Sequence, residues 1–235
     1  MDTIGDLLTR DRRSDDVAVR AVGAGEAVAT YTYEDFVTTA WKTGNFFSHR
    51  GAHAGAIVAV ADDRAVPPLL SFFGAVQLGA TVRFGRPVGT DGALYIAPGE
   101  RILDADLAPG TSRIAYHGRP DEPAVEAFGE SVWSENPVAP PESVAPDATA
   151  LETDGRTRSH ADLLARATDA AGRLSTGDTV VVREPLADPG VVVAGVLAPL
   201  HAGATIAFPA ATDGGDVAVA TGDAPEPRVI DPEAV

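Results

Sequence analysis

The 235-residue chain contains no cysteine and a single lysine, Lys42. Without cysteine it can form no disulfide, no thiolate nucleophile and no cysteine-ligated metal site. The other basic residues are arginine, and 34 acidic residues against 18 basic ones give a formal net charge of −16. A negative field of this size repels phosphate backbones and anionic lipids, so we expect neither nucleic acid nor a membrane as a partner.

An acidic surplus with almost no lysine is typical of haloarchaeal-type, salt-adapted proteins. Carboxylates stay hydrated when the Debye length has shrunk to about 3 Å at 1 M salt. The alternative is an acidic cytosolic protein from a GC-rich genome. No secretory signal is visible at the N-terminus, and the long uncharged stretches 65–82 and 189–212 contain prolines and break at a glycine before a β-like run. We therefore expect a soluble, cytoplasmic protein.

An internal repeat organises the chain. Three pairs of segments resemble each other in the same order: Thr32–Phe36 and Ser159–Leu163, Gly55–Val60 and Gly177–Val182, Gly79–Phe84 and Gly203–Phe208. In the first pair a hydroxyl residue is followed three positions later by an acid, which predicts a capped helix start. The second and third pairs are turns that lead into strands, with a buried helix between them. Each unit is thus predicted as helix, strand, buried helix, strand.

This alternation predicts an α/β fold with two related βαβ-type halves, in which mainly parallel sheets are covered by helices. Residues 93–97 and 113–117 are further candidate strands. We expect a first half over 1–136, a Pro-rich linker over 137–149 and a second half over 150–235. In the second half, Asp216–Ala220 is expected to form an edge strand, followed by a frayed acidic tail.

Two stretches, Thr30–Phe84 and Arg158–Phe208, resemble the N-terminal region of the adenylate-forming (AMP-binding, acyl-CoA synthetase) superfamily. The resemblance covers about half the chain and rests on the order and spacing of the segments rather than on one motif. It implies the two related α/β halves of that family's larger domain. For an active member it would also imply ATP with Mg²⁺ and CoA.

The chain departs from this family where its phosphate loop should lie, immediately before Ser159. A loop that holds a triphosphate needs backbone N–H groups exposed by glycines and a nearby cation. Here the segment Ala150–Arg158 is short, has one glycine and no lysine, and carries Glu152 and Asp154. The sequence given also stops at Val235, before the family's later motifs. No catalytic or cofactor-binding residue of the family can be carried over.

Other chemistry-bearing residues have simpler interpretations. His49 and His53 have a metal-compatible spacing, but Gly51 between them favours a solvated helix end, so no metal site is predicted. Gly23–Gly25 predicts a hairpin turn, and Lys42–Thr43 lacks the glycines of a phosphate-binding loop. Ser159 next to His160 is better explained as a helix cap than as a nucleophile. Trp133 could dock a partner or close a cleft, but we expect its indole to pack on the sheet.

Two main functions remain open. The first is a non-catalytic binding or assembly partner, acting with a complete acyl-CoA synthetase or with itself as a homo-oligomer, without a cofactor. The second is an acyl-CoA ligase that uses a divergent site or a second chain. In that case Arg156 and Arg158 would supply the positive charge, and ATP, Mg²⁺ and CoA would be needed. A third possibility is a module that binds a CoA-like or acyl ligand without turnover.

Overall fold

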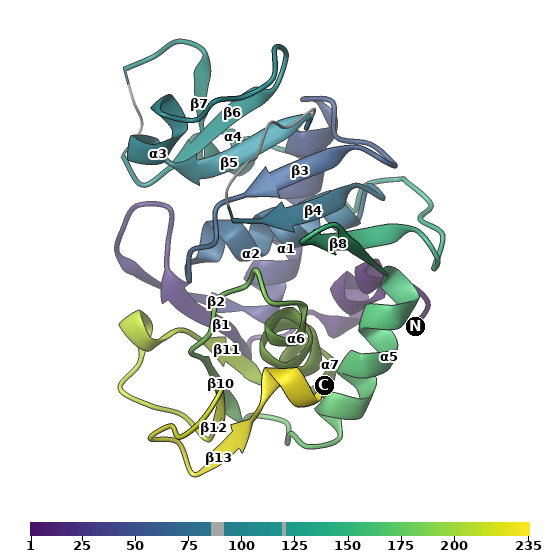
Figure 1. Ribbon diagram of the computed structural model, residues 1–235, viewed down its shortest axis with the longest axis vertical. Helices are drawn as coiled ribbons and strands as arrows, with labels where there is room; N and C mark the ends of the chain where they lie inside the picture. The colour runs from purple at the N-terminus through teal and green to yellow at the C-terminus, as the bar shows by residue number, and fades with distance from the viewer. Residues whose placement is uncertain (86–91, 119–120) are drawn as a thin grey trace.

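The computed structural model describes residues 1–85, 92–118 and 121–235 and contains two sheets. Figure 1 shows the seven-stranded sheet in the upper half of the molecule and the six-stranded sheet in the lower half. The seven-stranded sheet has the strand order β7-β6-β5-β3-β4-β8-β9, and the other has the order β13-β12-β10-β11-β1-β2. All neighbouring pairs are parallel except the hairpins β1–β2 and β8–β9. The predicted α/β class with two mainly parallel sheets is confirmed.

The helices and strands fall into two parts of the chain. In the first part of the chain they are β1 (Val17–Val22), β2 (Val28–Thr32), α1 (Tyr33–Ser48), β3 (Ile57–Val60), α2 (Val66–Val76), β4 (Thr81–Phe84), β5 (Leu94–Pro98), α3 (Gly99–Leu103), β6 (Ser112–Tyr116), β7 (Val125–Ala127) and α4 (Phe128–Trp133). In the second they are β8 (Thr149–Thr153), β9 (Arg156–Ser159), α5 (His160–Ala171), β10 (Thr179–Val182), α6 (Pro189–Val192), a π-helical segment (Val193–Leu197), α7 (Ala198–Ala202), β11 (Thr205–Ala207), β12 (Val217–Val219) and β13 (Arg228–Ile230).

Both predicted helix starts form as the sequence indicates. Thr32 accepts a hydrogen bond from the backbone N–H of Asp35, whose carboxylate reaches back to Thr32, and Ser159 accepts from the N–H of Asp162. These side chains satisfy backbone donors that the first helical turn leaves free. The strand–helix–strand order of the repeat then continues in both halves, although the helix of the second is divided into α6, the π-helical segment and α7. The unit β3–α2–β4 and the unit from β10 through α7 to β11 each place two parallel strands side by side around a buried helix.

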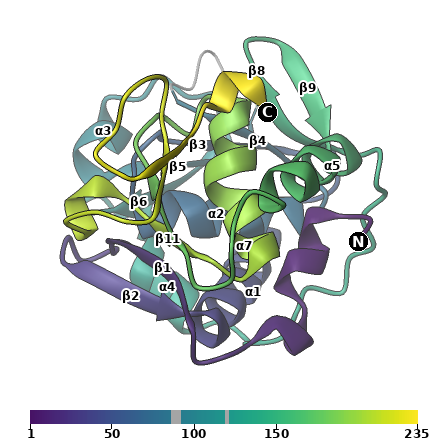
Figure 2. The same ribbon diagram turned by 90° about the horizontal axis from the view of Figure 1, so that it is seen from below.

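In each sheet, a hairpin from one part of the chain pairs with strands of the repeat in the other part. The N-terminal hairpin β1–β2 (Figure 2) joins the sheet of the second repeat, where Val19 of β1 pairs in parallel with Ile206 of β11. The hairpin β8–β9 joins the sheet of the first repeat, where Leu151 pairs with Val82. Helix α2 contacts strands of both sheets, which is why every one of its residues is buried. Each sheet contains strands from both sides of residues 137–149. The division of the chain at this segment stays a prediction.

Two expectations differ from the structure. The C-terminal tail is ordered rather than frayed: β13 pairs in parallel with β12, so β12 is not the edge, and a short 3₁₀ helix follows over Pro232–Ala234. Buried Ile230 holds this tail on the core. The indole of Trp133 does not pack on the sheet, because the side chain stands 80% exposed at the end of α4.

Candidate functional site

A cleft of about 1190 Å³ has walls from both repeats of the chain. Its walls come from the carboxyl end of β4, from the hairpin β8–β9 and from the loop that joins β10 to α6. Ligands of parallel α/β sheets bind beyond the carboxyl ends of the strands, so this cleft is the candidate site. It is lined by Ala59, Arg83, Phe84, Glu152, Thr153, Asp154, Gly155, Arg156, Arg158, Pro185, Ala187, Asp188 and Pro189.

The hairpin β8–β9 closes through only two residues, Asp154 and Gly155. Both have positive φ, 50° and 72°. Positive φ at both central positions is the geometry of the tight primed hairpin turn, for which Asp-Gly is a preferred sequence. Both residues between the two strands are therefore needed to reverse the chain direction, and no additional loop residues remain there to surround a ligand.

Three of the charged side chains on the cleft wall are in ion pairs: Arg83, Glu152 and Arg158. The Arg83 guanidinium lies 2.9 Å from the Glu152 carboxylate, across the β4–β8 strand pair. Arg158 lies 3.5 Å from Asp162 of α5. Within the described ranges, the exposed Arg156 has no ion-pair partner. The two arginines that the sequence singled out thus do meet at one cleft, but only Arg156 is left to receive an anion.

Hydrogen bonds fix the far wall of the cleft in place. The Asp62 carboxylate, two residues after β3, accepts from the backbone N–H groups of Leu186 at 2.7 Å and Ala187 at 3.1 Å. The Thr153 hydroxyl donates to the Ala187 carbonyl at 3.2 Å, and the Asp188 side chain caps α6 by accepting from the N–H of Gly190 at 2.8 Å. Hydrogen bonds thus connect the loop after β10 to Asp62 of the first repeat and to Thr153 of β8.

The loop after β10 also carries an ion pair whose carboxylate is buried. Arg183 makes two hydrogen bonds, of 2.9 and 2.7 Å, to the carboxylate of Glu226, whose side chain is fully buried. These bonds hold the pKa of Glu226 below its usual value. Sequence inspection missed Arg83, Asp62 and this pair. The only signal was the Asp62-Asp63 doublet directly after a predicted strand, where the carboxyl end of a parallel strand meets a site.

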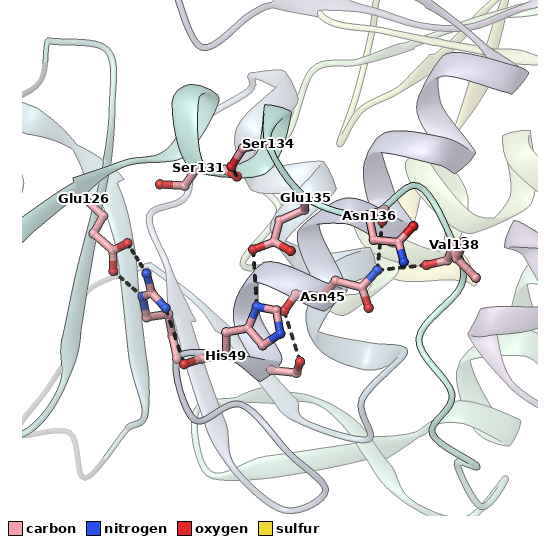
Figure 3. A network of polar contacts seen from close by, with 10 residues as sticks. Asn45, His49, Glu126, Ser131, Ser134, Glu135, Asn136 and Val138 are labelled. Carbon is pink, nitrogen blue, oxygen red and sulfur yellow. Dashed lines mark hydrogen bonds and ion pairs between the residues drawn. The ribbon is translucent and has the colours of Figure 1, made fainter.

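The other sequence candidates lie apart from this cleft. His49 is exposed at the end of α1 and points toward Glu135 (Figure 3). Its Nδ1 lies 3.3 Å from the Glu135 carboxylate, and His53 is exposed beyond it. His160 is buried, and its Nδ1 accepts from the backbone N–H of Ile4 at 3.2 Å. Burial lowers its pKa to about 4, so the ring is neutral at pH 7. Ser159 serves as the helix cap, as predicted.

Within the described residues, no group of three or more His, Asp or Glu side chains is placed to hold a metal ion, and no helix is long and apolar enough to cross a membrane. Among the described residues, the cleft has one cation without an ion-pair partner, Arg156, and the carboxylates of Glu152, Asp154 and Asp188. Such an arrangement can receive a small anion at Arg156, but carboxylates beside it oppose a highly charged one.

No protein-family model and no curated protein matches the sequence, whereas many solved structures match the fold. MatB from Rhodopseudomonas palustris in its apo form is 15% identical, with a TM-score of 0.69 over 92% of this chain and 48% of that chain. A benzoate CoA ligase from Burkholderia xenovorans LB400 is 17% identical, with a TM-score of 0.71 over 92% and 49%. An anthranilate CoA ligase in complex with anthranoyl-AMP is 15% identical, with a TM-score of 0.71 over 87% and 44%.

The chain thus spans about half the length of these structures. Identities this low show the fold and not the activity. The architecture, two mostly parallel sheets covered by helices, is shared with the matched part of these structures.

Proposed function

We propose that this chain does not form acyl-adenylates and acts by binding, as an assembly partner of a complete acyl-CoA synthetase or of a second copy of itself. The observation that carries the proposal is the two-residue turn Asp154-Gly155. The sequence resemblance places the family's phosphate loop at this position.

The physical argument concerns what a triphosphate needs. Several backbone N–H groups must point into one concavity, and a cation must accompany them. A two-residue turn between antiparallel strands has no spare backbone to form that concavity. The Glu152 and Asp154 carboxylates on the cleft wall add repulsion, and Glu152 already occupies Arg83. The framework is kept because packing alone requires it, since a fold can persist without the chemistry of its relatives.

A second candidate function is favoured by one observation, the unpaired Arg156 beside a cleft of about 1190 Å³. In this alternative the chain is an acyl-CoA ligase with a divergent site, and Arg156 and Arg158 contact the phosphates of ATP. The remaining catalytic groups would belong to that divergent site or to a second chain.

Calorimetric titration of Mg–ATP into the protein distinguishes the two. It should be done at both low and molar KCl, because salt weakens phosphate binding while an acidic protein can need salt to stay folded. We expect no saturable heat at concentrations of about 1 mM, where a typical substrate site would fill. A full-length CoA ligase in the same buffers is the positive control.

Saturable ATP binding that is lost in Arg156→Gln and Arg158→Gln, but kept in the remote Arg10→Gln, would establish the alternative. If ATP does not bind, sedimentation velocity of the chain alone and with a purified full-length acyl-CoA synthetase tests the assembly role. A monomer that remains separate from every synthetase tested would contradict that role.

A further inference from the structure

A second pocket of about 410 Å³ lies between α1, α2, α4 and β2 and shares no lining residue with the cleft. Its volume falls within the range of small-molecule sites. Its lining includes a group of apolar side chains from the beginning of α2 and from α4: Val66, Pro67, Leu70, Phe128 and Val132. Trp133 and Lys42 stand on the same wall.

Helix α1 holds the backbone at Trp133 and directly after it, although the Trp133 indole is 80% exposed. The Lys42 ammonium donates to the Trp133 carbonyl at 2.8 Å. The Asn45 side chain donates to the carbonyls of Asn136 at 2.9 Å and Val138 at 2.8 Å, as Figure 3 shows. Indoles are among the side chains that gain most from burial. Because the backbone of Trp133 is fixed on α1 while its indole stays in water, the indole offers a flat apolar face on which a ligand can stack.

The charges of the pocket leave one cation available. Arg13 pairs with Glu34, and the Asp35 carboxylate is used in capping α1. Within the described part of the chain, no carboxylate lies within ion-pair distance of Lys42. Its Nζ lies 5.8 Å from the Trp133 ring centroid. An ammonium has three N–H donors, so two remain after the bond to the Trp133 carbonyl.

We propose that this pocket binds a small amphipathic anion whose flat apolar body packs against Trp133 and the apolar wall, while its acidic group is held by Lys42. The ligand class follows from the pairing of an exposed indole with a cation that lacks an anionic partner beside an apolar surface. The proposal does not depend on the function proposed for the cleft.

The two tryptophans make a direct test possible. Trp41 is buried, with its indole N–H donated to the Leu8 carbonyl at 2.9 Å, and serves as an internal reference. Protein labelled with 5-fluorotryptophan gives one fluorine signal for each indole, and Trp133→Phe assigns them. The probes are 2-naphthalenesulfonate, its neutral analogue 2-naphthalenemethanol and the cationic 2-naphthylmethylamine. We expect the sulfonate to shift the Trp133 signal saturably and to leave the Trp41 signal in place.

Variants at the cation test the role assigned to it. Lys42→Gln should weaken sulfonate binding about tenfold or more, whereas Lys42→Arg should keep most of it, because the charge is retained. Arg156→Gln, which removes a cation of the cleft, should bind normally. The proposal fails if the sulfonate does not saturate by about 5 mM, if the neutral or cationic analogue binds as well, or if Lys42→Gln has no effect. It also fails if the Trp133 signal shifts with protein concentration alone, which would indicate a second copy on this surface.

Discussion

Protonation of His160 should couple the stability of this protein to pH. The ring is completely buried, and its Nδ1 accepts a hydrogen bond from the Ile4 N–H, so a proton at Nδ1 would face another donor. Its Nε2 is also buried and has no hydrogen-bond partner within the described structure. Burial therefore lowers the pKa of His160 from 6.5 to about 4, against a weaker opposite influence of the Asp6 carboxylate.

The magnitude follows from the two pKa values. The difference between 6.5 and about 4, at about 1.4 kcal/mol for each pKa unit, is worth about 3 kcal/mol. Because the folded pKa is the lower one, the unfolded chain takes up the proton first as the pH falls. The contribution to stability is complete above pH 6.5 and is lost between pH 6.5 and about 4. We expect the free energy of unfolding to fall by about 2 kcal/mol between pH 7.5 and pH 5 on account of His160 alone.

Urea unfolding at fixed KCl and at several pH values between 5 and 7.5 measures this loss. His160→Asn is the informative variant, because its amide oxygen can accept the Ile4 N–H while the side chain cannot titrate. It should be less stable than the wild type at pH 7.5 but should approach it as the pH falls. His53→Asn, at an exposed position, should keep the wild-type pH dependence. A stability difference between wild type and His160→Asn that stays constant within about 0.5 kcal/mol over this range would refute the reasoning.

Two further predictions concern the C-terminal part. A Cβ on Gly190 would lie 2.1 Å from the carbonyl oxygen of Pro232, so Gly190→Ala should displace the last residues and lower the free energy of unfolding by about 2 kcal/mol. Gly25→Ala has open space and should change it little, as thermal unfolding of both variants will show. Glu226→Gln should lower stability by about 2 kcal/mol at pH 7 by leaving Arg183 without its charge partner. Because the pKa of Glu226 is lowered in the folded state, its contribution to the free energy of unfolding is present above pH 4.5 and is lost as the pH falls through the folded pKa. Chemical unfolding should therefore show the stabilities of the wild type and Glu226→Gln converging below pH 4.5. A stability difference that does not change with pH would contradict the pairing.

The local elements could be predicted because their signals are local. Thr32 with Asp35 and Ser159 with Asp162 mark two helix starts, and turns before β-branched runs mark β3 and β10. The sheet order could not be predicted, because nothing in the residues of β1 specifies pairing with β11, about 190 positions later. The prediction of a frayed C-terminal tail was wrong for a similar reason. Its strands have only three residues each, and the β12–β13 pairing with burial of Ile230 keeps them in place.

The candidate site has one feature that the sequence predicts and one that depends on long-range pairing. The turn Asp154-Gly155 can be identified from the sequence, since Asp-Gly between two strand-like segments favours a two-residue hairpin. What faces that turn depends on the pairing of Leu151 with Val82, which brings the hairpin to the end of β4. This pairing lies within buried strand residues and needs nothing from the turn itself. The same scaffold can therefore carry loops of different length at this position without change to its core. Under the proposed function, the backbone at Asp154 and Gly155 is the feature that opposes ATP binding.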